Sequence, residues 1–252
     1  MEIRKSPGVV LASAVSGEAD RIARIFTRDY GKRTFVFKGI RKSRRRPVAA
    51  AEPGSVVNLV YYHRDGRDVC VVSECSIEKQ FYSIRENLDL IAHMCLVLEA
   101  VDKTSAPGDP NAGVYELLAG GIEALTKTSR LFHFSSFFLI RLLGMLGVLS
   151  VPDRCKTCHD SGFAAFLFDF SDMMPLCARC LGRSGAGRQG NLMGPAVLKF
   201  IAAASRMKFS SIDLDACTER EAGRLLYSLC MFLEHYFHAS LNSKSMIFTG
   251  EI

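Results

Sequence analysis

The sequence predicts an α+β fold: a five-stranded barrel at the N-terminus, then a helical bundle with an inserted four-cysteine module. Short segments rich in Val, Phe and Tyr, separated by turn residues, fill residues 8–77. A helical period of apolar residues begins at residue 84, and two Cys-x-x-Cys pairs later interrupt it. We therefore expect three domains, at residues 1–80, at residues 81–150 together with 191–252, and at residues 151–190.

Five strands are expected in the first domain. One of them is ambiguous, because Ile22, Ile25 and Phe26 suit a helix whereas the neighbouring segments suit a sheet. The context favours a strand. Five short strands with no long helix between them are typical of a small closed barrel. The expected strands are residues 9–15, 21–30, 33–38, 55–62 and 68–77.

Five helices are expected after the barrel, at residues 88–101, 111–127, 131–149, 195–207 and 219–240. The third is nearly long enough to cross a bilayer, but it carries Arg141 close to its middle. A central Arg costs about 2.5–3.5 kcal/mol on insertion scales. A buried core helix is therefore favoured, and no membrane association is expected.

Four cysteines form the most specific motif. Cys155-x-x-Cys158 and Cys177-x-x-Cys180 are separated by eighteen residues, of which residues 163–170 suit a short apolar hairpin. Two such pairs can surround one zinc ion, and four protein ligands leave no open position for water or substrate. We therefore expect one structural Zn²⁺ per chain, bound by Cys155, Cys158, Cys177 and Cys180.

Other readings of these cysteines remain. Cys155-x-x-Cys158-His159 matches the attachment pattern of a c-type haem, and a single Cys-x-x-Cys can be a redox pair. Haem attachment requires export, but residues 1–6 carry charges where a signal peptide needs an apolar stretch. A redox pair would leave the second Cys-x-x-Cys unexplained. The last alternative is a metal-free form of the same module.

Composition favours a cytoplasmic protein without catalytic activity. Nine cysteines and no expected signal peptide indicate a reducing compartment. The net charge of +6 is unevenly distributed, which favours a polyanionic partner. No Walker A, HExxH or nucleophile-elbow motif is found, so we expect no catalytic residue and no small-molecule substrate. Residues 185–190 spell G-x-G-x-x-G but follow a cysteine pair instead of a strand, so we expect a linker.

A run of cations follows the third expected strand. Six Lys or Arg residues and no acid lie within residues 38–46. A solvated surface loop is the plainer interpretation, but small five-stranded barrels commonly bind nucleic acid through basic grooves and exposed aromatic rings. The candidate rings, most of which should belong to the core, are Tyr30, Phe35, Phe37, Tyr61 and Tyr62. The candidate nucleic-acid-binding cations are Arg21, Arg24, Lys32, Arg33, Lys38, Arg41, Lys42, Arg44, Arg45 and Arg46.

A series of short motifs runs through the chain. They are Gly17-Glu18-Ala19-Asp20-Arg21-Ile22, Phe26-Thr27-x-x-Tyr30-Gly31-Lys32, Lys38-Gly39-x-Arg41-Lys42, residues 138–147, and Asp153-Arg154-Cys155-x-x-Cys158. Together they resemble the RecO family of bacterial recombination mediators. The resemblance covers nearly the whole chain, and it implies an OB-fold barrel, a helical bundle and an inserted four-cysteine zinc module. His159 stands where a small residue is usual.

The resemblance also implies a function and partners. Members of that family bind single- and double-stranded DNA, anneal complementary strands and, together with RecR, help to load RecA onto DNA coated by single-strand-binding protein. It implies a nucleoid-associated protein whose helical domain receives the acidic C-terminal tail of single-strand-binding protein. Such a tail needs an apolar cleft with cations at its rim, and the segment 131–149 offers Arg130 and Arg141 for this partner site.

Two other classes of function remain as alternatives. The first is a sequence-specific regulator that reads DNA with its zinc module, although residues between the cysteine pairs lack a basic recognition helix. The second is an enzyme that modifies nucleic acid and uses the barrel for targeting. Strong dependence of binding on duplex sequence would favour the first, and turnover of a nucleotide substrate would favour the second.

Overall fold

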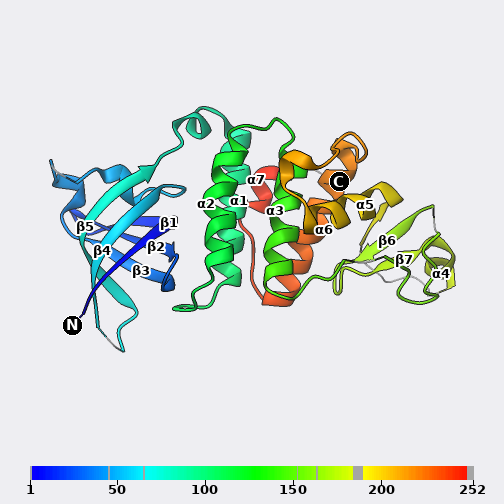
Figure 1. Ribbon diagram of the computed structural model, residues 1–252, viewed down its shortest axis with the longest axis horizontal. Helices are drawn as coiled ribbons and strands as arrows, with labels where there is room; N and C mark the ends of the chain where they lie inside the picture. Colours follow the sequence, from blue (N-terminus) through cyan, green and yellow to red (C-terminus); the bar gives the residue numbers. More distant parts are fainter. Residues whose placement is uncertain are drawn as a thin grey trace. The chain divides into compact units, whose positions relative to one another are not determined.

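A computed structural model describes residues 2–44, 46–64, 66–151, 153–162, 164–183 and 190–248 (Figure 1). The chain forms two compact units, Met1–Lys127 and Thr128–Ile252. The barrel and the first two long helices belong to the first unit, and the later helices and the cysteine module belong to the second. The division into functional domains at residues 80, 150 and 190 stays a prediction.

The first unit contains a closed barrel of five strands. They are β1 (Glu2–Ser16), β2 (Asp20–Thr27), β3 (Gly31–Phe37), β4 (Val56–His63) and β5 (Val69–Lys79), in the order β1-β2-β3-β5-β4. The N-terminal half of β1 pairs with β4 and the C-terminal half with β2, with an irregularity between Val10 and Ala12. Such an irregularity bends a strand, which lets one strand serve both sides of a barrel. The expected OB-like barrel is confirmed, including the ambiguous strand at β2.

Alternating apolar residues fill the barrel. Ile25, Phe35, Phe37 and Tyr61 have no exposed surface, and Leu59 is almost completely buried. Because successive side chains of a strand point to opposite faces, the residues between them face outward. Each buried side chain of this size stabilises the fold by about 1.5–3 kcal/mol. Two 3₁₀ turns, Ile40–Lys42 and Val48–Ala51, lie between β3 and β4.

Two glycines of the RecO-like motifs occupy positions that other residues would strain. Gly31 has φ 65°, and a Cβ there would lie 2.2 Å from the carbonyl oxygen of Asp109. Gly39 also has φ 65°, and its N–H donates a hydrogen bond of 2.7 Å to Asp20. Left-handed backbone conformations of this kind favour glycine. These motifs therefore encode the turns on both sides of β3.

Two helices complete the first unit, α1 (Leu88–Thr104) and α2 (Ala112–Leu125), after a 3₁₀ turn at Tyr82–Glu86. Asparagine caps the N-terminus of each: Asn87 accepts hydrogen bonds from two backbone N–H groups, and Asn111 accepts one. Near the C-terminus of α1, the buried carboxylate of Asp102 binds Arg24 of β2 at 2.8–3.0 Å and Lys32 of β3 at 3.6 Å. This cluster joins two strands of the barrel to α1.

The second unit is built on α3 (Leu131–Met145), α5 (Pro195–Arg206) and α6 (Glu219–Phe237), with a short 3₁₀ turn at Phe209–Ser211 and a short helix α7 (Lys244–Ile247). A capping box of Thr218 and Glu221 starts α6, and α3 packs against both α5 and α6. Helix α3 is buried along most of its length and ends four residues earlier than expected. No described helix combines the length and the apolar character that a bilayer span requires.

The cysteine module lies between α3 and α5. Strands β6 (Phe166–Asp169), β7 (Pro175–Cys177) and β8 (Gly190–Met193) form a small antiparallel sheet in the order β7-β6-β8, and α4 (Ala178–Arg183) follows β7. The expected hairpin at residues 163–170 supplies one described strand, β6, and β6 pairs instead with β7 and with β8, which begins where a linker was expected. Residues 185–189, the rest of that expected linker, lie outside the described residues.

Replacing Asp102 by Asn tests the cluster at the C-terminus of α1. The substitution keeps the side-chain shape but leaves Arg24 and Lys32 without their buried carboxylate. We expect the free energy of unfolding to fall by about 2 kcal/mol. Urea titration followed by circular dichroism measures the change.

The matched control is Asp68→Asn, because Asp68 is exposed in the loop between β4 and β5. Its expected effect lies within about 0.5 kcal/mol. Equal stability of the two variants would show that the Asp102 cluster does not hold the first unit together.

Candidate metal centre and nucleic-acid interface

The four cysteines of the two Cys-x-x-Cys pairs lie together. Cys155 and Cys158 precede β6, whereas Cys177 ends β7 and Cys180 lies in α4. The four sulfur atoms lie within 4.8 Å of one another, and those of Cys158 and Cys177 are 3.7 Å apart. Sulfurs bound tetrahedrally to zinc at about 2.3 Å are separated by about 3.8 Å. The cluster therefore has the donor atoms and the spacing to hold a metal ion.

The charges of the cluster also fit a cation. Burial alone would raise the pKa of the Cys155 thiol, but backbone N–H groups of Cys177, Cys158 and Thr157 lower this pKa to about 6. The hydrogen bond with the Cys158 sulfur, together with burial, raises the pKa of Cys180 to about 12. The protein alone thus favours the thiolate form of some of these cysteines and opposes the presence of four thiolates at once. A bound divalent cation removes this opposition.

Polar contacts stabilise the turn that carries the first pair. Lys156 binds Asp169 at 3.0 Å and Asp172 at 2.9 Å, which ties this turn to the end of β6. The N–H of Cys155 donates to the carbonyl oxygen of Asp160 at 2.8 Å. His159 adopts φ 58°, a left-handed conformation in which histidine is among the more tolerated side chains. Glycine adopts this conformation most readily, which agrees with the small residue expected at that position.

The cations of β2 and β3 have structural partners. Arg24 and Lys32 bind Asp102, and the Nε of Arg21 donates to the hydroxyl of Ser13 at 3.0 Å. Arg24 nevertheless keeps 52% of its side chain exposed, whereas Lys32 keeps only 15%. Arg33 differs, because its Nε is buried without a hydrogen-bond partner among the described residues.

The basic loop after β3 lies against the turn between β1 and β2. Lys38 binds Asp20 at 2.8 Å, Lys42 binds Glu18 at 3.2 Å, and Arg41 donates to the carbonyl oxygen of Glu18 at 3.1 Å. Hydrogen bonds from Lys38 and from the backbone N–H of Gly39 lower the pKa of Asp20, so its carboxylate is ionised at neutral pH. Residues distant in sequence thus hold the loop in place.

The loop keeps a positive excess at the surface. Lys38 and Lys42 retain 65% and 66% of their side chains exposed although each binds a carboxylate. The loop has five described cations, and two carboxylates bind it, Asp20 at Lys38 and Glu18 at Lys42; the cations are Lys38, Arg41, Lys42, Arg44 and Arg46. Arg45 lies outside the described residues. This excess can attract phosphate groups.

One row of outward apolar residues crosses the barrel. Ile22 of β2 pairs with Val36 of β3, Val36 with Val71 of β5, Val71 with Tyr62 of β4, and Tyr62 with Ile3 of β1. Val71 and Ile3 are 38% and 61% exposed. Of the five candidate rings, Tyr62 is thus the one in this outward row, whereas Phe35, Phe37 and Tyr61 are buried. In OB-folds the face of strands 2 and 3 and the loops beside it bind oligonucleotides, and Ile22 and Val36 of this row lie on those strands.

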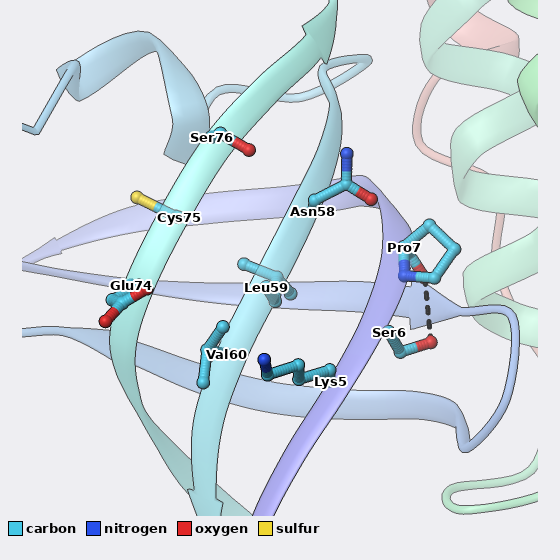
Figure 2. Close-up of a pocket in the computed structure, with 9 residues that line it drawn as sticks. All are labelled: Lys5, Ser6, Pro7, Asn58, Leu59, Val60, Glu74, Cys75 and Ser76. Carbon is cyan, nitrogen blue, oxygen red and sulfur yellow. Dashed lines mark hydrogen bonds between the residues drawn. The ribbon is translucent and has the colours of Figure 1, made fainter.

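A separate hollow of about 380 Å³ lies on the outer face of β1, β4 and β5 (Figure 2). Lys5 pairs with Val60 and Val60 with Glu74, so a cation and a carboxylate lie at the two ends of one row. Asn58 and Ser76 form the next row. Because this hollow has no excess of positive charge, the loop at residues 38–46 is the better candidate surface for a polyanion.

The two cations expected at a partner site bind other residues of the second unit. Arg130 binds Asp215 at 2.7 Å and Glu219 at 3.8 Å. Arg141 donates to the carbonyl oxygen of Ser205 at 2.7 Å, near the C-terminus of α5. Cations at a helix C-terminus stabilise the helix. Arg141 therefore has a structural role, and a partner role for either residue stays a prediction.

Comparison with known protein families agrees with these features. Two family models match the chain: Recombination protein O N terminal over residues 1–81, and Recombination protein O C terminal over residues 85–245. The chain belongs to the RecO family. The resemblance in the sequence motifs is thereby confirmed.

Curated RecO relatives match over most of the chain. The DNA repair protein RecO of Exiguobacterium sibiricum is 27% identical over 97% of this chain and 96% of its own length. The protein of the same name from Acetivibrio thermocellus is 28% identical over 72% of each chain. A third, from Chloroherpeton thalassium, is 30% identical over 61% of this chain and 60% of its own length.

Membership of the RecO family places the chain in DNA repair and recombination. The family is one of repair mediators, and membership implies DNA binding. Sequence reasoning missed Asp102, whose carboxylate binds Arg24 and Lys32, because this acid lies on a helix far along the chain.

Proposed function

We propose that this RecO protein binds single- and double-stranded DNA with the barrel and anneals complementary strands. The observation that carries the proposal is the positive excess of the loop at residues 38–46, held beside the strands β2 and β3. The candidate contacts are the loop cations Lys38, Arg41, Lys42, Arg44, Arg45 and Arg46, of which Lys38, Arg41, Lys42 and Arg44 are exposed, with Arg21 and Arg33 beside them.

Annealing needs no nucleophile and no cofactor. Two strands repel each other through their phosphates, and a basic surface that binds both reduces this repulsion while the bases stay free to pair. The apolar row around Tyr62 offers a surface on which unpaired bases can stack. Lys and Arg contacts to phosphate carry no sequence information, so we expect little sequence preference.

We propose that the four-cysteine cluster holds one structural Zn²⁺. All four donors are cysteine sulfurs, their spacing suits a tetrahedron, and no open position would remain for a substrate. The ion would fix the shape of the module between α3 and α5. It takes no part in annealing.

We further propose that this protein acts in the cytoplasm, at the nucleoid, and with RecR helps to load RecA onto strands coated by single-strand-binding protein. Family membership supports this proposal. In it, the second unit receives the acidic C-terminal tail of single-strand-binding protein, with Arg130 and Arg141 near the binding cleft.

Arg130→Gln is the better probe, because the guanidinium of Arg141 also binds α5. A labelled tail peptide should bind the wild type several-fold more tightly; equal affinities would place the tail elsewhere.

Neutralising the basic loop tests the DNA proposal. The variant replaces Arg41, Lys42, Arg44, Arg45 and Arg46 by Gln. We expect weaker binding to single strands and duplex alike, and a loss of annealing. The slope of log affinity against log salt should fall by about 0.7 per lost phosphate contact for single strands and about 0.9 for duplex. Fluorescence anisotropy at four salt concentrations measures both quantities.

Two control variants sharpen this test. Lys103→Gln with Lys127→Gln removes exposed cations away from the loop and should leave the slope unchanged. Glu18→Gln removes the carboxylate that binds Lys42 and should tighten binding. An unaltered slope in the five-residue variant, with circular dichroism showing a folded protein, would mean that the loop is only a solvated surface.

Metal analysis tests the zinc proposal. We expect one zinc per chain in the purified protein, and a loss of the small β-sheet when a chelator removes it. Cys177→Ser should lower the metal content and the solubility, while Cys230→Ser, which changes a buried cysteine outside the cluster, should leave the metal content unchanged. Well under one zinc per chain would contradict the proposal, and a Soret absorption band would replace it with the haem alternative.

A further inference from the structure

One sulfur of the four-cysteine cluster differs from the other three in its exposure. Cys155 is 0% exposed, Cys177 is 2% and Cys180 is 4%, whereas Cys158 is exposed. Cys158 ends the first pair and precedes the left-handed turn at His159. A dissolved reagent must touch the sulfur that it modifies. Cys158 is therefore the corner of the cluster that such a reagent reaches first.

A cation from the second half of the module covers this corner. Arg179 lies in α4, and its Nη2 is 3.8 Å from the sulfur of Cys158 and 3.2 Å from Oδ2 of Asp160. Because Nη2 carries two hydrogen atoms, it can donate to the sulfur and to the carboxylate at once. Arg179 thus connects α4 to the turn that carries the first pair.

Asp160 has further contacts that fix its position. Its carbonyl oxygen accepts from the N–H of Cys155 at 2.8 Å, and its Oδ1 accepts from the N–H of Gly162 at 2.9 Å. The turn that carries the first two ligands therefore also holds the carboxylate. From this place the carboxylate orients the guanidinium of Arg179 toward the sulfur of Cys158.

The charges of a zinc centre would favour this contact. Four thiolates carry more negative charge than one divalent ion offsets. Lys156, a cation of the same turn, binds Asp169 and Asp172, so two carboxylates already neutralise it. Arg179 faces one carboxylate and one sulfur. An N–H donor stabilises the negative charge of a thiolate, which is the nucleophilic form of cysteine. Removing this donor should therefore raise the reactivity of the sulfur.

We propose that Cys158 is the modification site of the metal centre for soft electrophiles, and that Arg179, oriented by Asp160, is a positioning residue that lowers the reactivity of its sulfur. The site rests on the proposed structural Zn²⁺, since a metal-bound cysteine is already deprotonated. With iodoacetamide, the sulfur of Cys158 forms a bond to carbon with its electron pair, the carbon–iodine bond breaks, and iodide leaves. The thioether that results is uncharged and binds metal more weakly than a thiolate does. Loss of zinc follows.

The experiment treats the full-length, zinc-loaded protein with limiting iodoacetamide. Peptide mass spectrometry locates the modified cysteines, and a chromophoric chelator reports the zinc released and the zinc affinity. Arg179→Gln removes the donor, and Arg179→Lys keeps the charge without the planar fork. The matched control is Arg183→Gln, which removes an exposed cation from the same short helix. The half-buried Cys75 and Cys95, outside the cluster, serve as internal references for the reagent.

We expect Cys158 to be modified first among the four cysteines. In Arg179→Gln, its modification should be several-fold faster and the zinc affinity about tenfold weaker, the lower end of the effect of losing a residue that supports a metal ligand. Arg183→Gln should behave as the wild type, and Arg179→Lys should lie between the two. Asp160→Asn keeps Arg179 but removes the carboxylate that orients it, and should act in the same direction as Arg179→Gln.

The cobalt-loaded protein gives a readout that a purely structural role would not change. The sulfur-to-cobalt charge-transfer band should move to lower energy in Arg179→Gln, because the electrons of the Cys158 sulfur lose a hydrogen bond that stabilises them. Arg183→Gln should leave the band in place. Circular dichroism shows that each variant is folded.

Two results would overturn the inference and leave the structural zinc standing. The first is initial modification at Cys155, Cys177 or Cys180. The second is an equal modification rate and an equal band position in Arg179→Gln and Arg183→Gln. A wild type that binds neither zinc nor cobalt would instead contradict the proposed zinc centre, and the inference with it.

Discussion

A buried carboxylate near the C-terminus of a helix is the constraint on which the first unit depends. The helix dipole disfavours an acid at that end, and Asp102 of α1 is almost completely buried there. It is stabilised only because Arg24 of β2 and Lys32 of β3 bring two positive charges to it. Removing one partner of a buried ion pair is strongly destabilising. Arg24 and Lys32 are therefore bound to the fold, and under the proposed function contact with a polyanion falls to the cations of the loop after β3.

Local patterns in the sequence predict most of the fold, because alternation and helical period depend on neighbouring residues. The five strands, the long helices and the four-cysteine module all follow from such patterns. Three features do not. The parallel pairing of β3 with β5, the start of β1 at Glu2 and the pairing of β8 with β6 depend on strands that meet only after folding. Gly190, for example, reads as part of a linker, yet its Cβ position lies 1.9 Å from the backbone of Phe168.

The candidate sites likewise differ in how far local sequence patterns predict them. The grouping of Cys155, Cys158, Cys177 and Cys180 follows from spacing alone, since each pair lies on one turn. The basic run is different, because the partner of Arg24 lies 78 residues further along the chain. A charge run therefore shows where cations are, but only the fold shows which of them are already neutralised. The same limit applies to aromatic residues: Tyr61 and Tyr62 are adjacent in sequence, and the pleat of β4 directs one inward and the other outward.

Glu18 and Asp20 give the basic loop a property that the sequence run lacks. Under the proposed function, a phosphate that binds Lys38 or Lys42 must displace or share a carboxylate that already holds it. Exposed pairs of this kind contribute only about 0–1 kcal/mol each, so DNA can displace them. These pairs nevertheless reduce the free energy that is gained when Lys38 or Lys42 binds a phosphate. The affinity for DNA is therefore lower, while the number of cations that screen the two strands is unchanged. A protein that anneals strands must also release the duplex it has formed. Internal carboxylates beside the loop favour that release, because they rebind the cations as the phosphates leave.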